Sequence, residues 1–174
     1  MHPTSATAHS VERLRAAAAG FAAQHAAIDE GRPWPLHNVD EGGGPESEWG
    51  PIEVLAHVAE MLQFWLGEIE RVLDGAPEPV PFGRTTSDRV RVMTIERDRT
   101  LPPRELVDRI AATTERYARR LETLGSAELA RRGLHPTLGE LDVGKILERF
   151  VVGHAEGHVE QLAEALGART HSPD

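Results

Sequence analysis

The sequence predicts an all-α protein built as a four-helix bundle with long crossover connections. Four stretches repeat apolar residues at intervals of three and four positions, the spacing of amphipathic helices. Two connections between them are longer than the short loops of a simple up-down bundle, so we expect up-up-down-down connectivity. The 174-residue chain is long enough for one domain with its own core, which we place at 11–167 between flexible segments at 1–10 and 168–174.

The first expected helix covers about residues 11–28. Ser10 is suited to cap its N-terminus, and Gly31-Arg32-Pro33 stops the helical pattern. Its apolar side carries Val11, Leu14, Ala18, Phe21, His25 and Ile28.

The second expected helix covers about residues 51–73. Gly50 can occupy the N-cap, Pro51 suits the first helical position, and Glu53 favours the positive end of the helix dipole. The helix should stop at Asp74-Gly75-Ala76-Pro77. Its broad apolar face carries Leu55, Val58, Leu62, Trp65, Leu66, Ile69 and Leu73.

The third helix is expected from Pro103 to about Leu124, and the fourth from an Asp142 cap to Leu166, with Gly167 as its stop. In the long connection at 74–102, residues 90–95 are predicted to form a short strand or a helical turn. The same connection carries arginines that could hold a substrate carboxylate by bidentate contact: Arg84, Arg89 and Arg91.

Composition excludes several classes of site. The chain contains no cysteine, so a metal would have to be held by His, Asp, Glu or water, and a thiol would have to come from a small molecule. A net charge of -9 argues against a broad nucleic-acid surface. No apolar run reaches the roughly 18 residues of a membrane span, and residues 1–10 do not resemble a signal peptide, so a cytoplasmic location is expected.

The most informative motif is the pair His154 and His158 in the fourth helix. At about 100° per residue, positions i and i+4 lie on one face, and this face also carries apolar residues and Gln161. Two imidazoles aimed at a buried interior are either hydrogen-bonded core histidines or ligands of a shared metal ion. Gln161 could orient a water molecule or the substrate, or simply bridge two helices.

A catalytic metal site needs a third protein ligand and an open position. His57, near the edge of the apolar face of the second helix, is the best candidate. His25 on the first helix is the reserve, and His135 lies in a connection whose direction is not predictable. A metalloprotease is excluded, because Ala155 occupies the position of the general-base glutamate that follows the first histidine of the zincin motif.

Three segments together resemble the DinB superfamily. They are WGPIEVLAHVAE at 49–60, HPTLGELDVGKIL at 135–147, and the spacing of His154, His158 and Gln161-Leu162. The chain departs from the family at Gly50, where Ser or Thr is frequent, and residues 80–99 carry no motif for a substrate.

The resemblance implies an up-up-down-down bundle, often dimeric, and a divalent metal, zinc or nickel among the options, held by His57, His154 and His158. It implies kinship with thiol S-transferases that use bacillithiol or mycothiol, and with the metal-binding domain of mycothiol-dependent maleylpyruvate isomerase. We therefore expect a metal-dependent S-transferase whose partners are a small-molecule thiol and an electrophile. A metal-dependent hydrolase and a non-enzymatic metal- or ligand-binding protein stay open as alternatives.

Overall fold

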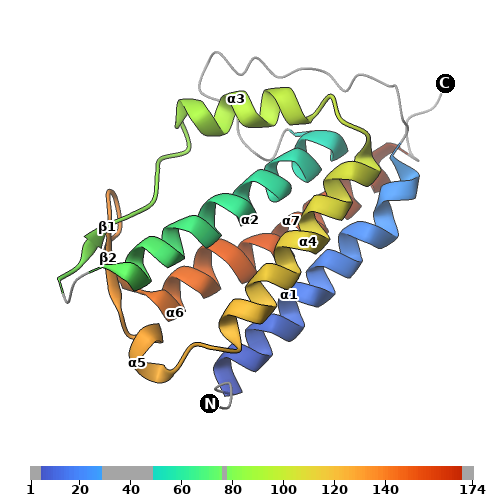
Figure 1. Cartoon of the computed structure of the whole chain (residues 1–174). Coiled ribbons are helices and arrows are strands. Elements are labelled where there is room, and N and C mark those ends of the chain that lie inside the picture. Colours follow the sequence, from blue (N-terminus) through green and yellow to red (C-terminus); the bar gives the residue numbers. More distant parts are fainter. Residues whose placement is uncertain (1–4, 29–48, 76–77, 170–174) are drawn as a thin grey trace.

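Four long helical elements pack side by side in the part of the chain that the structure, a computed structural model, describes: residues 5–28, 49–75 and 78–169 (Figure 1). The first three are α1 (Ser5–Gln24), α2 (Pro51–Asp74) and α4 (Pro103–Leu121). The fourth is a continuous helical rod made of α6 (Val143–Ile146), η4 (Leu147–Val152) and α7 (Gly153–Arg169). The predicted all-α four-helix bundle is confirmed.

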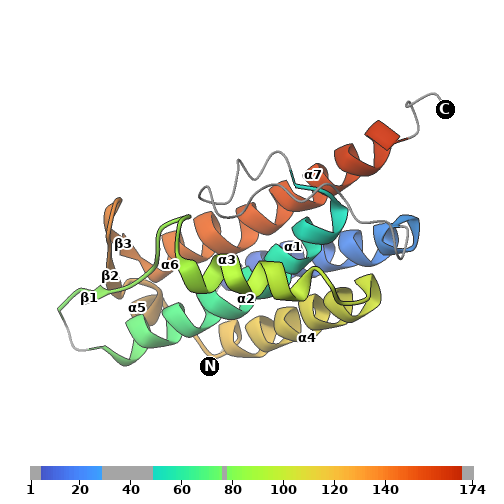
Figure 2. The same ribbon diagram turned by 90° about the horizontal axis from the view of Figure 1, so that it is seen from above.

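The order of helix directions differs from the prediction. Helices α1 and α2 each pack against α4 and α7 and so lie diagonally across the bundle. The chain runs up along α1, down along α2 and α4, and up along α6 to α7, rather than up-up-down-down (Figures 1 and 2). Only the connection at 75–102 carries the chain back along the bundle, because α2 begins at the end of the bundle where α1 finishes. A long connection can lead to either end of the bundle, so its length does not determine the direction of the next helix.

Three of the four predicted helix starts are found, that at Asp142 among them, and the start at Ser10 is not. Gly50 is the N-cap of α2 in an extended conformation, and Pro51 is its first residue, as predicted. Helix α4 begins at Pro103 as predicted. Helix α1 begins at Ser5, so Ser10 lies inside it, and its hydroxyl donates to the Ala6 carbonyl (3.1 Å) instead of capping the helix. A short 3-10 turn, η1 (His25–Ala27), follows α1, and the stop predicted at 31–33 lies outside the described residues.

The long connection after α2 forms a strand and a helix. Strand β1 (Val80–Pro81) is followed by α3 (Arg89–Asp98), which packs against α2 (Figure 2). The expectation of a short strand or a single helical turn at 90–95 is therefore corrected to a helix of 10 residues. The signal that was missed is Asp88, whose side chain accepts the backbone N–H of Arg91 at 3.0 Å and caps the helix.

A small sheet, which the sequence patterns did not predict, closes one end of the bundle. After the short helix α5 (Ser126–Leu129), strands β2 (Arg132–His135) and β3 (Gly139–Asp142) form an antiparallel hairpin, and β1 pairs with β2 in parallel. Gly139 has a φ of 74°, a left-handed conformation that favours glycine at this turn. Asp142 ends β3 and caps α6 by accepting the Lys145 N–H at 2.7 Å, as the sequence predicted.

The fourth helix is not a uniform α-helix, because η4 is a π-helical segment of six residues. A π segment adds a residue to the turn and so rotates everything that follows it. Phe150 inside η4 stacks on Trp65 of α2 (ring centroids 4.3 Å apart) and on His135 of β2 (5.3 Å). These aromatic contacts connect η4 to its neighbours within the bundle and the sheet.

Arg13 of α1 holds the fourth helix on both sides of this transition. Its guanidinium Nη1 donates to both carboxylate oxygens of Glu148 in η4 (2.9 and 2.8 Å). Its Nε and Nη2 donate to Glu156 in the first turn of α7 (2.8 and 2.5 Å). One arginine therefore fixes the rotation of α7 relative to the π segment.

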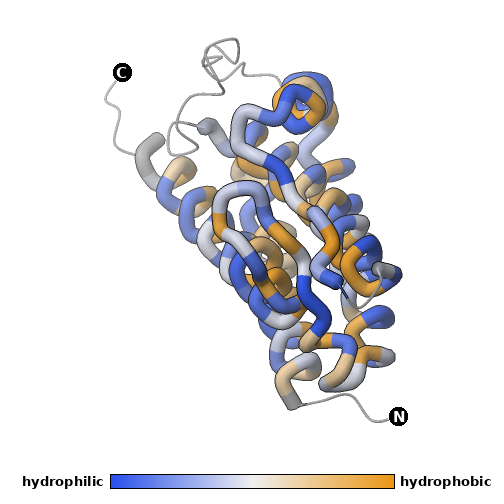
Figure 3. The backbone as a smooth tube through the Cα atoms, turned by 90° about the vertical axis from the view of Figure 1, so that its left-hand side faces the viewer, coloured by the Kyte–Doolittle hydropathy of each residue, from blue (hydrophilic) through white to orange (hydrophobic). Residues whose placement is uncertain are grey.

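The core lies between the four bundle helices and receives apolar side chains from all of them. Apolar and polar positions alternate along the helices, as expected when each buries one side (Figure 3). The Tyr117 hydroxyl is buried there and donates to the Leu62 carbonyl at 2.9 Å, which links α4 to α2. Among the described helices, none has the length and apolarity that a membrane crossing requires.

Replacing Tyr117 by Phe should test this buried link. The variant keeps the ring and its packing but loses one hydrogen bond, so the free energy of unfolding should fall by about 1 kcal/mol. Urea unfolding monitored by circular dichroism would measure the change. The slope of the unfolding free energy against urea concentration should equal that of the wild type. An unchanged midpoint would show that the hydroxyl contributes nothing to α2–α4 packing.

Candidate metal centre

Three histidines converge where α2 crosses α7. His57 lies in the second turn of α2, and His154 and His158 lie in the first two turns of α7. One ring nitrogen from each lies within 4.8 Å of the others. The side chains of His57 and His158 are buried, with 2% and 5% of their surface exposed, and His154 is half-buried. The structure thus brings together the three residues that the sequence selected as ligands.

The spacing of the His57 and His154 nitrogens fits a tetrahedral cation. Metal–nitrogen bonds of about 2.0–2.1 Å place neighbouring nitrogens of a tetrahedral site about 3.3 Å apart. The Nε2 atoms of His57 and His154 are 3.4 Å apart. The buried His57 Nδ1 makes no hydrogen bond to any described residue, so His57 is not a core histidine satisfied by a carboxylate or a carbonyl.

Gln161 sets the tautomer of one imidazole. His158 Nδ1 lies 2.7 Å from Gln161 Oε1, an amide oxygen that can only accept. The Nδ1–H therefore donates, and Nε2 of His158 keeps the lone pair that a metal needs. Gln161 therefore orients an imidazole of its own helix, whereas its position in the sequence left open a role toward water or substrate and a bridge between two helices.

The imidazoles of His57 and His154 are held in the neutral form. Burial is the main cause that lowers the pKa of His154, to about 4, and His158 and Arg91 add to it. Burial also places the pKa of His57 well below 6.5, with further contributions from His158, Arg91, His154 and Arg84. At neutral pH both rings therefore offer lone pairs, which is the state that binds a metal.

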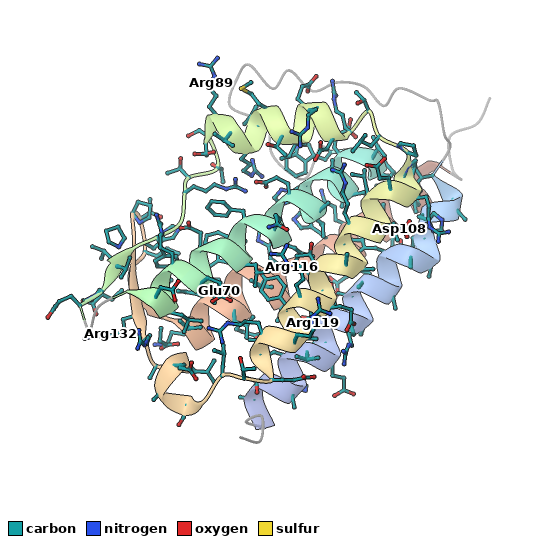
Figure 4. The ribbon with its side chains drawn as sticks, in the orientation of Figure 1. Glu70, Arg89, Asp108, Arg116, Arg119 and Arg132 are labelled. Carbon is teal, nitrogen blue, oxygen red and sulfur yellow. The ribbon has the colours of Figure 1, made fainter. Side chains whose placement is uncertain are left out.

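The charged side chains that lower the pKa of His57 and His154 include arginines, with Arg91 acting on both. Arg91 is buried, its guanidinium lies over the Trp49 ring (5.2 Å), and the Trp49 ring meets the His57 ring edge-on at 4.9 Å. Of the other arginines predicted to hold a carboxylate, Arg84 pairs with Glu60 through two contacts of 2.6 and 2.5 Å. Arg89 projects from α3 into solvent (Figure 4). Arg91 is thus the one of the three that lies beside the histidines.

The two reserve ligand candidates lie elsewhere. His25 Nδ1 is 2.7 Å from the Ala22 carbonyl in the turn after α1. His135 is buried at the end of β2, stacked on Phe150, and its Nδ1 accepts the Thr137 N–H at 3.3 Å. Neither belongs to the three-histidine group found among the described residues.

No carboxylate joins that group in the described part of the chain. Glu60 is engaged by Arg84, and Glu53 lies 3.4 Å from the Arg99 guanidinium. Three nitrogen ligands without a fourth protein ligand are the donor set of an open site, in which one position is left for water or a substrate.

Comparisons with known proteins agree with this architecture. The sequence model of the DinB superfamily matches residues 5–162. A solved structure described as "YfiT from Bacillus subtilis is a probable metal-dependent hydrolase with an unusual four-helix bundle topology" is similar, with a TM-score of 0.73 and 16% identity. The alignment covers 95% of this chain and 89% of that one, and at this identity it shows a shared fold. No functionally curated protein matched the sequence.

His154→Ala should separate a metal centre from a cluster of core histidines. Purified wild-type protein should carry about one divalent ion per chain, as expected of one three-histidine site, and the variant should carry almost none. Inductively coupled plasma mass spectrometry on dialysed samples measures both, with His25→Ala as the matched control that keeps its metal. Equal metal content in wild type and His154→Ala would contradict the assignment.

Arg13 and Arg15 form a natural pair for testing how α7 is held. Arg15 lies on the same helix and contacts Glu115 of α4 through two bonds of 2.8 Å, but it does not contact the helix of the histidines. Arg13→Gln should weaken zinc binding by roughly fivefold, about 1 kcal/mol, because α7 loses its rotational restraint. Arg15→Gln should leave it within about twofold. Chelator competition gives both affinities, and equal losses would refute a specific role of Arg13.

Proposed function

Because the chain belongs to the DinB superfamily, we propose that it is a metal-dependent thiol S-transferase that uses a low-molecular-weight thiol of the mycothiol type. The observation that carries this proposal is the convergence of His57, His154 and His158, with no carboxylate of the described residues in the group. Zinc or nickel is the ion that we expect there, since both accept imidazole nitrogen.

An open site favours catalysis over a structural role. Structural zinc is normally enclosed by four protein ligands, whereas catalytic zinc keeps a position for a substrate. Glu53 and Glu60 are the acidic residues of α2 nearest to His57 in sequence, and each contacts an arginine instead of joining the histidines. As far as the described residues go, this arrangement leaves the fourth position to an external ligand.

A divalent ion held by three neutral imidazoles would keep its full charge and would lower the pKa of a thiol or a water at the open position. The side chains support this role in separate ways. Burial keeps His57 and His154 unprotonated, and Gln161 holds His158 in the ligating tautomer. The positive charge of Arg91 beside Trp49 and His57 favours an anionic partner such as a thiolate.

The thiol has to be a second substrate, because the chain contains no cysteine. In the proposed reaction the sulfur of this thiol forms a bond to an electrophilic carbon. The thiol proton is released to solvent, and the leaving group departs with the electron pair of the broken bond. The protein contributes position and charge, and it forms no covalent intermediate of its own.

A metal-dependent hydrolase is the second candidate, favoured by the printed description of the similar Bacillus subtilis structure. The same open position would then serve water instead of a thiol. No general base is assigned to this reaction, because Glu53 and Glu60 both face arginines. A non-enzymatic metal- or ligand-binding protein is the third candidate. It would hold the same metal but would catalyse no reaction.

Activity assays on the metal-loaded protein distinguish these candidates. The transferase should conjugate mycothiol to 1-chloro-2,4-dinitrobenzene faster than the uncatalysed reaction, and His154→Ala should reduce the rate at least about a hundredfold, as loss of an essential ligand implies. His25→Ala should retain the wild-type rate. Bacillithiol, coenzyme A and cysteine in parallel reactions report the thiol preference.

Two outcomes would overturn the transferase. One is the absence of conjugation with every thiol despite full metal loading. The other is thiol-independent release of nitrophenol from nitrophenyl esters, lost in His154→Ala, which would establish the hydrolase. Full metal loading with neither activity would favour the binding protein.

A further inference from the structure

A second concave site lies outside the three histidines, between α2, α3 and α4. Its volume is about 750 Å³, within the range of small-molecule pockets. Its lining comes from α2, from the segment before α3, from α3 and from α4, and it contains none of the three histidines. Phe64, Ala59, Ala112 and Val90 supply its apolar wall.

The charges of the pocket are unlike those of the whole chain. Its lining holds four arginines (Arg84, Arg97, Arg109 and Arg116) and three acidic residues (Glu60, Asp88 and Asp98), whereas the chain has 19 basic and 28 acidic residues. Each acid is already engaged by the protein. Glu60 binds Arg84, Asp98 accepts from both Arg97 and Arg109, and Asp88 caps α3.

Arg116 is the arginine whose charge is not neutralised by this network. Its Nη1 donates to the Gln63 amide oxygen at 2.6 Å, a neutral acceptor, and it has no carboxylate partner among the described residues. Figure 4 shows Arg116 on α4 beside α2, where these helices face each other. When Gln63 accepts with its oxygen, its amide N–H groups stay available as donors near the same cation.

Thr113 supplies a second, independent polar group one turn before Arg116. It lines the pocket with only 6% of its surface exposed. Positions 113 and 116 are i and i+3 on α4, so both side chains lie on the same side of the helix.

We propose that this pocket is a binding site for a small aromatic or alicyclic carboxylate. The carboxylate would accept from the Arg116 guanidinium, the Thr113 hydroxyl and the Gln63 amide, and the apolar body would lie against Phe64 and Ala112. A guanidinium suits a carboxylate because its planar donors match two oxygens. The proposal goes beyond the metal chemistry and does not rest on the S-transferase function.

Binding of a matched pair of probes tests the site. 1-Naphthaleneacetate and 1-naphthaleneacetamide share shape and apolar surface but differ in charge. Isothermal titration of the full-length, metal-free protein should show the carboxylate binding about tenfold more tightly, the factor that a charge-assisted hydrogen bond of about 1.4 kcal/mol provides. Arg116→Gln should abolish this preference, and Thr113→Val should weaken carboxylate binding by roughly fivefold.

Arg119→Gln is the matched control, because Arg119 is an exposed arginine of the same helix that does not line this pocket. It should leave carboxylate binding unchanged. Equal affinity for the two probes, or equal losses in Arg116→Gln and Arg119→Gln, would overturn the proposal. Binding that requires added zinc and disappears in His154→Ala would also overturn it, since the carboxylate would then be a ligand of the metal centre.

Discussion

Burial of three imidazoles between α2 and α7 is the constraint on which the rest of the structure depends. Imidazoles lose hydration in such a place, and their nitrogens then need partners. Burial keeps the pKa of His154 near 4 and that of His57 well below 6.5, so the rings do not acquire charge that the site could not solvate. The same burial makes them ligands at neutral pH. Stability and metal-binding capacity therefore depend on the same crossing of two helices.

For the three histidines to meet, α7 has to keep both its rotation about its own axis and its distance from α2. His154 and His158 follow a π-helical segment, and such a segment turns the helix beyond it to a new orientation. Phe150 stacks on Trp65 and His135, while Arg13 bonds to Glu148 before the transition and to Glu156 after it. Contacts from α1, α2 and the sheet thus meet on one short stretch. The contacts on this stretch orient His154 and His158 toward His57.

Positive side chains lie at two particular places of a chain whose net charge is negative. The chain carries a net charge of -9, yet Arg91 lies beside the Trp49 and His57 rings, and Arg116 faces the pocket between α2, α3 and α4. Both places carry positive side chains although the chain as a whole is acidic. Two acidic side chains in the lining of that pocket, Glu60 and Asp98, are paired with other arginines than Arg116. Helix α3 belongs to both environments, since Arg91 and the residues of the pocket's outer wall come from it.

The sequence by itself determined the bundle helices, the metal-ligand candidates and the family. Helical periodicity and caps such as Gly50-Pro51 and Asp142 act over a few residues, and the i, i+4 spacing of His154 and His158 is a property of one helix. The tertiary structure alone decided the directions of the helices, the β2–β3 hairpin, the π segment and the charged pocket. A connection of given length can deliver the chain to either end of a bundle. A π turn persists only where side chains distant in sequence hold it, as Arg13, Trp65 and His135 do here. Such contacts depend on packing between helices, which local patterns do not encode.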